Sequence, residues 1–366
     1  MLKQFLAISR NTFLEAIRQP IFVVLILVGT LAMLLNPFFA AYTMDPGEGD
    51  NRMLVDLGLG TLFLAGMLLA AFTATGVVAS EMESRTALTV VSKPVPRPIF
   101  VLGKFLGVAG AIAIALYILM LVLLFTVRHK VMQNASDHLD GPVIVFSVLA
   151  VLGALIIAAG ANYLYRRVFT STFTATLAGL LTLAFIIVLM VAPDWSFQSP
   201  MHDLTDHEHQ MVQIIIASFL ISQGVMVLTA IAVALSTRLS QVATLLACLV
   251  LLVLGLVTGA LSQHINQRLG LDAQAATLQS IQPILNSGEP FIQKTLYLAG
   301  KALYVVVPNF QFHWPSDAIS LESSLIHDEN GDFSTSYIRN VTLYTAAYIT
   351  ALLALGVALF QKREVN

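Results

Sequence analysis

Long apolar stretches alternate with short polar ones along the whole chain. A helix needs about 20 consecutive apolar residues to cross the hydrocarbon core of a bilayer. Eight stretches meet that length, at residues 21–43, 54–79, 105–127, 142–165, 171–192, 212–236, 242–261 and 341–360. The pattern therefore predicts an all-α fold, a polytopic transmembrane helix bundle of about eight spans. The alternative is that residues 142–192 form one re-entrant hairpin instead of two spans.

The parts between and before these stretches complete the predicted organisation. Residues 1–20 are expected to form an interfacial helix in the headgroup region, because five apolar side chains can share one of its faces: Phe5, Ile8, Phe13, Ala16 and Ile17. A fraying polar tail is the alternative. Residues 21–261 would hold seven spans and a charged segment at 80–98. Residues 262–340 form one long extracytoplasmic loop, and residues 341–366 the last span and a tail.

The long loop contains its own apolar segment at residues 290–308. Lys294 and Lys301 interrupt this segment, and a ninth span here would bury a lysine in lipid. We therefore expect an amphipathic helix that lies on the outer leaflet or dips into it. The aromatic cluster that follows, at residues 308–315, is typical of the membrane–water interface.

Composition agrees with a membrane protein. Hydrophobic residues make up 57% of the chain and charged residues 11%, against about 25% charged in a soluble domain. The net charge of −2 gives no basic excess with which to bind nucleic acid. Cys248 is the only cysteine, so no intrachain disulfide can form.

The distribution of lysine and arginine predicts the orientation in the membrane. If the N-terminus is cytoplasmic, the short inner segments carry 12 of the 19 basic residues. Eight spans then return the C-terminus to the cytoplasm. The exception is residues 128–130, where Arg128 and Lys130 end the third span on the outer side.

Catalytic and metal-binding motifs are scarce. The outer loop at residues 194–210 offers weak metal-ligand candidates in His202, His207 and His209. A pair of histidines two residues apart does not share a helix face, and no HExxH motif is present, so a solvated acidic loop is the favoured interpretation. The sequence also lacks the GxxxxGK[ST] motif that binds nucleotide phosphates. We expect no catalytic site, no metal, no cofactor and no enzymatic activity of the chain's own.

Apart from Asp56, near the start of the second stretch, the apolar stretches as bounded above contain no Asp, Glu, Lys, Arg or His. Carriers driven by protons or ions usually need an ionisable residue at membrane depth to bind the coupling ion. If this protein transports a solute, its energy should therefore come from outside the membrane.

A charged segment at residues 80–97 is where that energy could enter. It contains Glu81, Glu83, Arg85, Lys93 and Arg97, and no Gly or Pro between residues 80 and 92. The pattern predicts a short cytoplasmic helix that ends at a run of three prolines. A loop that follows the positive-inside rule would explain the basic residues but not the two glutamates.

The segment SEMESRTALTVVSKPVPRPIFVLGKFLG at residues 80–107 resembles the region after the second span in type-2 permeases of ABC exporters. Three other stretches resemble the same family, in the same order along the chain. They are NTFLEAIRQPIF at residues 11–22, AVALSTRLS at 232–240 and LYVVVPNFQFHWPSDAI at 303–319. Such permeases usually have six spans, so residues 142–192 look like an added hairpin.

The resemblance implies the permease subunit of an ATP-driven exporter in the bacterial cytoplasmic membrane. It implies a second permease subunit, and a separate cytoplasmic P-loop ATPase that binds the ATP. The residues implied to contact that ATPase are Glu81, Glu83, Arg85, Thr86, Ser92, Lys93 and Arg97. Two other hypotheses remain open. One is a membrane-embedded metal-dependent enzyme that uses the histidine loop, and the other is a membrane anchor or sensor that transports nothing.

Overall fold

The computed structural model describes residues 1–41, 48–79, 96–131, 139–205, 211–268, 290–314 and 334–361. Most of the charged segment, residues 80–95, lies outside this range. Within the described residues the fold is helical, and the only β pairing is the isolated bridge between Val191 and Phe197.

Eight of the helices are long and apolar enough to cross a membrane, which confirms the predicted number of spans. They are α2 (Pro20–Ala40), α3 (Glu48–Ala74), α6 (Arg97–His129), α7 (Gly141–Tyr165), α8 (Phe169–Leu189), α10 (Met211–Ser236), α11 (Gln241–Arg268) and α15 (Thr335–Gln361). Because α7 and α8 each reach the length of a full span, the structure favours two spans over a re-entrant hairpin.

Shorter elements connect these helices. Helix α1 (Leu2–Arg18) precedes α2, and the chain turns between them at Gln19, whose extended backbone conformation is the one a following proline favours. The π-helix η1 (Thr75–Ala79) continues α3. Helix α9 (Pro200–Thr205) follows α8, and helix α13 (Phe291–Val306) and the 3₁₀ turn η2 (Phe310–His313) come between α11 and α15.

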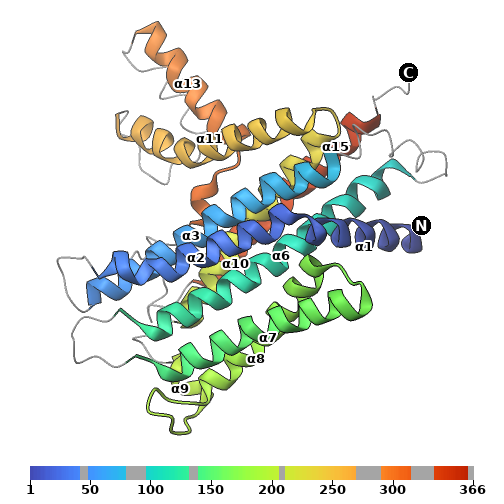
Figure 1. The fold of residues 1–366 in the computed structure, drawn as a ribbon. Helices are drawn as coiled ribbons and strands as arrows, with labels where there is room; N and C mark the ends of the chain where they lie inside the picture. The colour runs from blue at the N-terminus through green and yellow to red at the C-terminus, as the bar shows by residue number, and fades with distance from the viewer. Residues whose placement is uncertain are drawn as a thin grey trace.

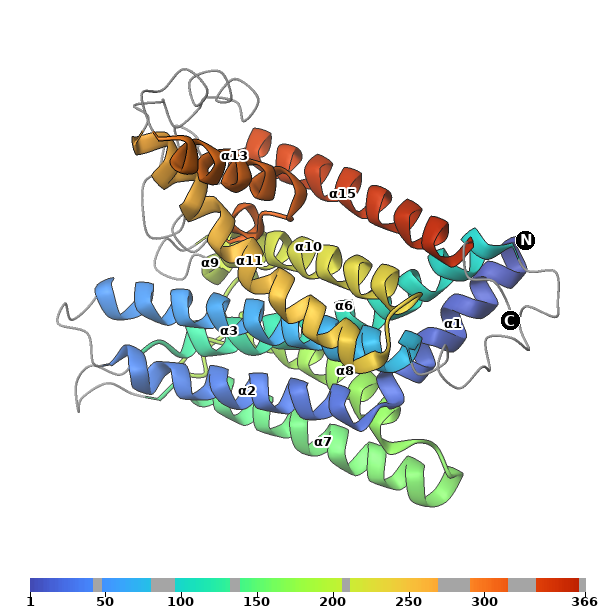
Figure 2. The same ribbon diagram turned by 90° about the horizontal axis from the view of Figure 1, so that it is seen from above.

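The core of the bundle lies where α3, α6 and α10 pack together, since these are its most buried spans. Helices α7 and α8 form a hairpin along one side of the bundle, with α8 packed against α6 (Figure 1). Helices α11, α13 and α15 lie on the other side of the core (Figure 2). Many large apolar side chains of α2, α7 and α11 face outward, as expected for helices in contact with lipid.

Helix α1 begins, and helix α15 ends, at the same end of the bundle, which we call the terminal end (Figure 2). The turns between α7 and α8 and between α10 and α11 lie there too. The opposite end, which we call the far end, holds α9 and the starts of α3, α7 and α15. An even number of crossings requires this arrangement.

Helix α6 is longer than the sequence pattern predicts. Its 33 residues are about 50 Å long, well beyond the roughly 30 Å of a hydrocarbon core. The prediction ended at residues 105 and 127, but the helix also includes Lys104 and Arg128, and both are almost fully buried. The expectation that the spans are nearly free of ionisable residues is therefore wrong for α6, where the protein itself surrounds these two charges, and α3 carries Asp56 as well.

Candidate functional site

At the terminal end, helix α1 packs tightly along the first half of α6. Two glycines of α6 make this contact possible. A Cβ atom on Gly103 would lie 2.9 Å from Cγ2 of Ile8, and one on Gly107 would lie 2.6 Å from the carbonyl oxygen of Ser9. Thr12 is fully buried in the same interface. The predicted interfacial helix is therefore joined to the bundle through its protein-facing side.

One ion pair and one aromatic contact accompany this packing. Lys104 Nζ lies 3.9 Å from Glu15 Oε2 and 5.8 Å from the centre of the Phe100 ring. The lysine is buried, whereas Glu15 is about one-third exposed. The pair joins α1 to α6 near the point where α6 leaves the charged segment.

The start of α6 also contacts the end of α15. The Phe100 and Phe360 rings stack with centroids 5.5 Å apart and an angle of 16° between their planes. The guanidinium carbon of Arg97 lies 6.0 Å above the same Phe360 ring. From the turn between α10 and α11, Arg238 Nε donates a hydrogen bond to the carbonyl oxygen of Leu359 at 2.8 Å. Three distant parts of the sequence thus meet at the terminal end.

Of the seven residues implied to contact an ATPase, the structure describes Arg97. The other six, namely Glu81, Glu83, Arg85, Thr86, Ser92 and Lys93, lie outside the described residues. The two flanks of the charged segment are described. On the upstream side, Gly76 of η1 is so close to Gln19 that a Cβ atom would lie 3.0 Å from its Oε1. On the downstream side, Arg97 meets Phe360.

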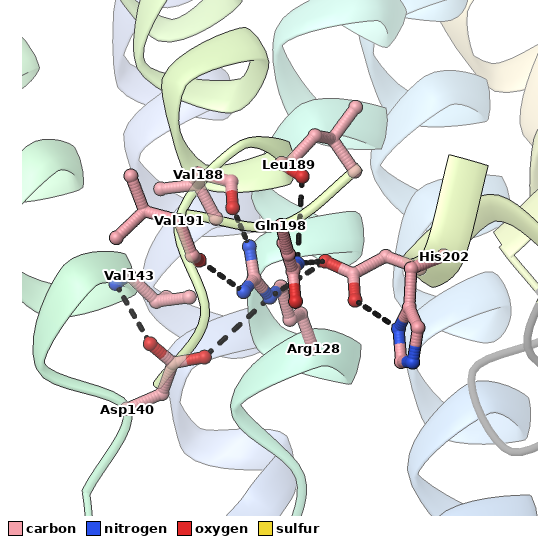
Figure 3. A network of polar contacts seen from close by, with 9 residues as sticks. Arg128, Asp140, Val143, Val188, Leu189, Val191, Gln198 and His202 are labelled. Atoms are coloured by element: carbon pink, nitrogen blue, oxygen red, sulfur yellow. Dashed lines mark hydrogen bonds and ion pairs between the residues drawn. The ribbon is translucent and has the colours of Figure 1, made fainter. Parts of the chain in front are cut away.

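At the far end, a buried polar network surrounds Arg128, the exception to the positive-inside pattern (Figure 3). Its Nε lies 3.5 Å from Asp140 Oδ2 and 3.2 Å from Asp203 Oδ2. Its two terminal nitrogens donate to the carbonyl oxygens of Val188 and, at 2.7 Å, Val191. These partners belong to the start of α7, the end of α8 and α9, so one guanidinium joins the α7–α8 hairpin to α6.

Two further residues complete the network. Gln198 Nε2 donates to Asp203 Oδ2 at 2.8 Å, and Asp140 Oδ1 accepts a hydrogen bond of 3.1 Å from the backbone nitrogen of Val143 as the N-cap of α7. Sequence reasoning did not anticipate this network. The sequence feature that could have indicated it is Arg128 itself, the basic residue on the outer side of the membrane. A buried arginine requires anionic or carbonyl partners.

The metal-ligand candidates are placed only in part. The His202 side chain is 68% exposed, and its Nδ1 lies 3.5 Å from Asp203 Oδ1. His207 and His209 lie outside the described residues. Over the described ranges, no group of three His, Cys, Asp or Glu side chains is arranged to hold a metal ion. Asp203 is instead bound to Arg128 and Gln198.

Between α13 and α15, the chain enters the bundle. We call residues 307–314 the insert. Its Phe310 and His313 are fully buried, so the expectation that this aromatic cluster lies at the membrane interface is wrong for both. Two glycines near the midpoints of α10 and α11 admit it. A Cβ atom on Gly224 would lie 2.9 Å from His313 Cβ, and one on Gly255 would lie 2.6 Å from the Pro308 carbonyl oxygen.

The last residue of the insert packs against α3. The Trp314 and Phe63 ring centroids lie 5.0 Å apart and nearly perpendicular, and Phe63 also contacts Phe310 edge-on at 6.4 Å. The insert therefore lies among α3, α10, α11 and α15.

The sequence model of one protein family, described as ABC-2 family transporter protein, matches residues 6–215. The match covers more than half of the 366 residues and includes most of α1, the flanks of the charged segment and the α7–α8 hairpin. No curated protein matches the chain.

Proposed function

Because this chain belongs to the ABC-2 family of transporter proteins, we propose that it is the permease subunit of an ABC exporter driven by a separate cytoplasmic ATPase. The family match supports a membrane component of an ABC transporter. The sequence has no P-loop motif, so ATP would be bound and hydrolysed by the partner.

The observation that carries the proposal is how the flanks of residues 80–95 are held. Upstream, η1 lies against the junction of α1 and α2 through Gly76 and Gln19. Downstream, Arg97 and Phe100 contact Phe360. A force applied to the charged segment would therefore reach α1, α3, α6 and α15 together. In this proposal Glu81, Glu83, Arg85, Thr86, Ser92, Lys93 and Arg97 form the coupling segment that the ATPase contacts.

The proposal places the terminal end in the cytoplasm of a bacterial cell. The distribution of basic residues supports this orientation, since 12 of 19 would lie on that side. Both termini are then cytoplasmic. The Arg128 network lies on the extracytoplasmic side, from which the insert enters the bundle. A second permease subunit, identical or related, would complete the transporter.

Copurification tests the proposal directly. The full chain is expressed in its native host with an affinity tag, extracted in mild detergent and purified. We expect a P-loop ATPase to copurify in stoichiometric amount, and to be lost when Glu81 and Glu83 are both replaced by lysine. Asp194→Lys is the matched control, because Asp194 is an exposed carboxylate in the far-end loop. If no ATPase accompanies the native chain, the proposal is wrong.

A further inference from the structure

Helix α15 contacts both the exit of the coupling segment and the insert. At its terminal end, Phe360 stacks on Phe100, and the Leu359 carbonyl oxygen accepts the hydrogen bond from Arg238. The Phe100–Phe360 stack is an apolar contact between two helices that are far apart in sequence. A displacement of the first turn of α6 toward Phe360 would therefore push on the last turn of α15.

Farther along the same helix, four side chains of α15 hold the insert and the residue before it. Tyr348 donates to the Val306 carbonyl oxygen at 2.6 Å, and Tyr337 donates to the Phe312 carbonyl oxygen at 3.0 Å. Tyr344 accepts a hydrogen bond of 3.1 Å from the Asn309 backbone nitrogen. Thr345 Oγ1 lies 2.9 Å from His313 Nε2.

These contacts differ from those that α10 and α11 make with the insert. Gly224 and Gly255 leave space for the insert, whereas α15 supplies directional hydrogen bonds. Helix α11 adds one, from Gln311 Nε2 to the Leu256 carbonyl oxygen at 3.2 Å. A directional bond transmits a displacement in either direction, while a steric contact transmits only a push. The insert should therefore follow α15 more closely than it follows α10 or α11.

Helix α15 is suited to act as a rigid rod. Its 27 residues are about 40 Å long and contain no proline that would kink it. It is also among the least buried of the spans, and its main packing partner is α10, to which Gln223 Nε2 and Thr342 Oγ1 join it by a hydrogen bond of 3.0 Å. One close approach to α10 is at Gly356, where a Cβ atom would lie 3.2 Å from Ala234.

We propose that α15 transmits movement of the coupling segment to the insert, with Phe360 and Arg238 as positioning residues at one end and Tyr344 and Tyr348 at the other. The inference rests on the proposed function, because it needs an ATPase to move the coupling segment. It adds a route by which ATP binding in the cytoplasm changes the position of Val307–Trp314 among α3, α10 and α11.

Trp314 is a built-in reporter of the insert, since the chain has only two tryptophans. In a Trp195→Phe chain purified with its ATPase, the permease fluorescence comes from Trp314 alone. A parallel chain with both Trp195→Phe and Trp314→Phe gives the signal of the ATPase, which is subtracted. We expect Mg-ATP to shift the emission of Trp314, because its contact with Phe63 changes as the insert moves.

Phe360→Ala should make that shift at least about threefold smaller while the ATPase still copurifies. The substitution removes the contact between α15 and Phe100 but leaves the hydrogen bonds between α15 and the insert in place. Tyr344→Phe combined with Tyr348→Phe should have the same effect, and these changes lie far from the ATPase and alter little volume. Phe360→Leu removes the aromatic ring but keeps most of the apolar volume. It serves as a second variant in case Phe360→Ala does not fold.

The outcomes separate the two proposals. A full shift in both the Phe360→Ala and the double tyrosine variants overturns the role of α15. So does an unchanged emission in a native complex that hydrolyses ATP. If no ATPase copurifies with the native chain, the proposed function itself fails, and the role of α15 falls with it.

Discussion

At the far end, Arg128 is buried between two aspartates and two backbone carbonyls. At the terminal end, the described contacts between helices include close approaches at glycines, stacked rings and a partly exposed ion pair. A buried ion network holds only one geometry well, because each displaced partner leaves an unpaired charge in a medium of low dielectric constant. Apolar and aromatic contacts tolerate small displacements at little cost. The far end of the hairpin is therefore built to stay fixed to α6, and the terminal end is built to move.

The largest effect is expected at the fixed end. Arg128→Leu leaves Asp140 and Asp203 buried without their cation, and removing one partner of a buried pair costs about 3–5 kcal/mol. We expect a large drop in melting temperature of the purified protein and early protease cleavage in the α7–α8 hairpin.

His202→Ala is the matched control, because His202 contacts the same Asp203 but is mostly exposed. It should cost less than about 1 kcal/mol. Equal melting temperatures for Arg128→Leu and His202→Ala would contradict the view that the network anchors the hairpin.

At the terminal end, stability should depend more on the volume of side chains in the contact between α1 and α6 than on their charge. Gly107→Ala would place a Cβ atom 2.6 Å from the Ser9 carbonyl oxygen, so α1 must shift, at a cost of about 1–3 kcal/mol. Gly160→Ala in α7 is the same substitution in open space, since no atom lies within 4 Å of its Cβ position.

Gly160→Ala should therefore be neutral or stabilise by up to about 1 kcal/mol, because alanine has the higher helix propensity. Thermal denaturation of the two variants side by side checks the difference. If Gly107→Ala is also neutral, α1 does not pack on α6 as described.

The smallest effect is expected at the ion pair of the terminal end. Glu15→Gln removes the partner of Lys104 at 3.9 Å, but Glu15 is partly exposed and the lysine also lies over Phe100. We expect a loss below about 1 kcal/mol that shrinks further in high salt. A loss as large as that of Arg128→Leu would remove the contrast between the two ends.

The sequence predicted the spans well because membrane thickness sets their length, and a run of apolar residues is a local property. The same pattern placed the ends of α6 wrongly, because it uses only local sequence. Lys104 and Arg128 interrupt the apolar run, and their partners, Glu15, Asp140 and Asp203, come from other helices and loops. A local pattern cannot reveal that a charge will be buried beside a remote carboxylate.

The insert shows the same limit. The composition of its aromatic residues fits the membrane interface equally well. Room for it inside the bundle comes from glycines far away in the sequence, among them Gly224 and Gly255. Within the candidate site, the sequence identified Arg97 as part of the charged segment but gave no sign of its contact with Phe360. That contact depends on where the last span ends relative to the first turn of α6.

The rate of ATP hydrolysis by the reconstituted complex tests the central claim, that an ATPase acts on residues 80–97, most directly. The native chain should stimulate hydrolysis by its ATPase. Replacing Glu81 and Glu83 by lysine should reduce that stimulation by at least about tenfold, since reversing two charges at a docking surface costs more than 1.4 kcal/mol. Asp194→Lys should leave the rate unchanged. Full stimulation by the Glu81→Lys, Glu83→Lys chain would contradict the account.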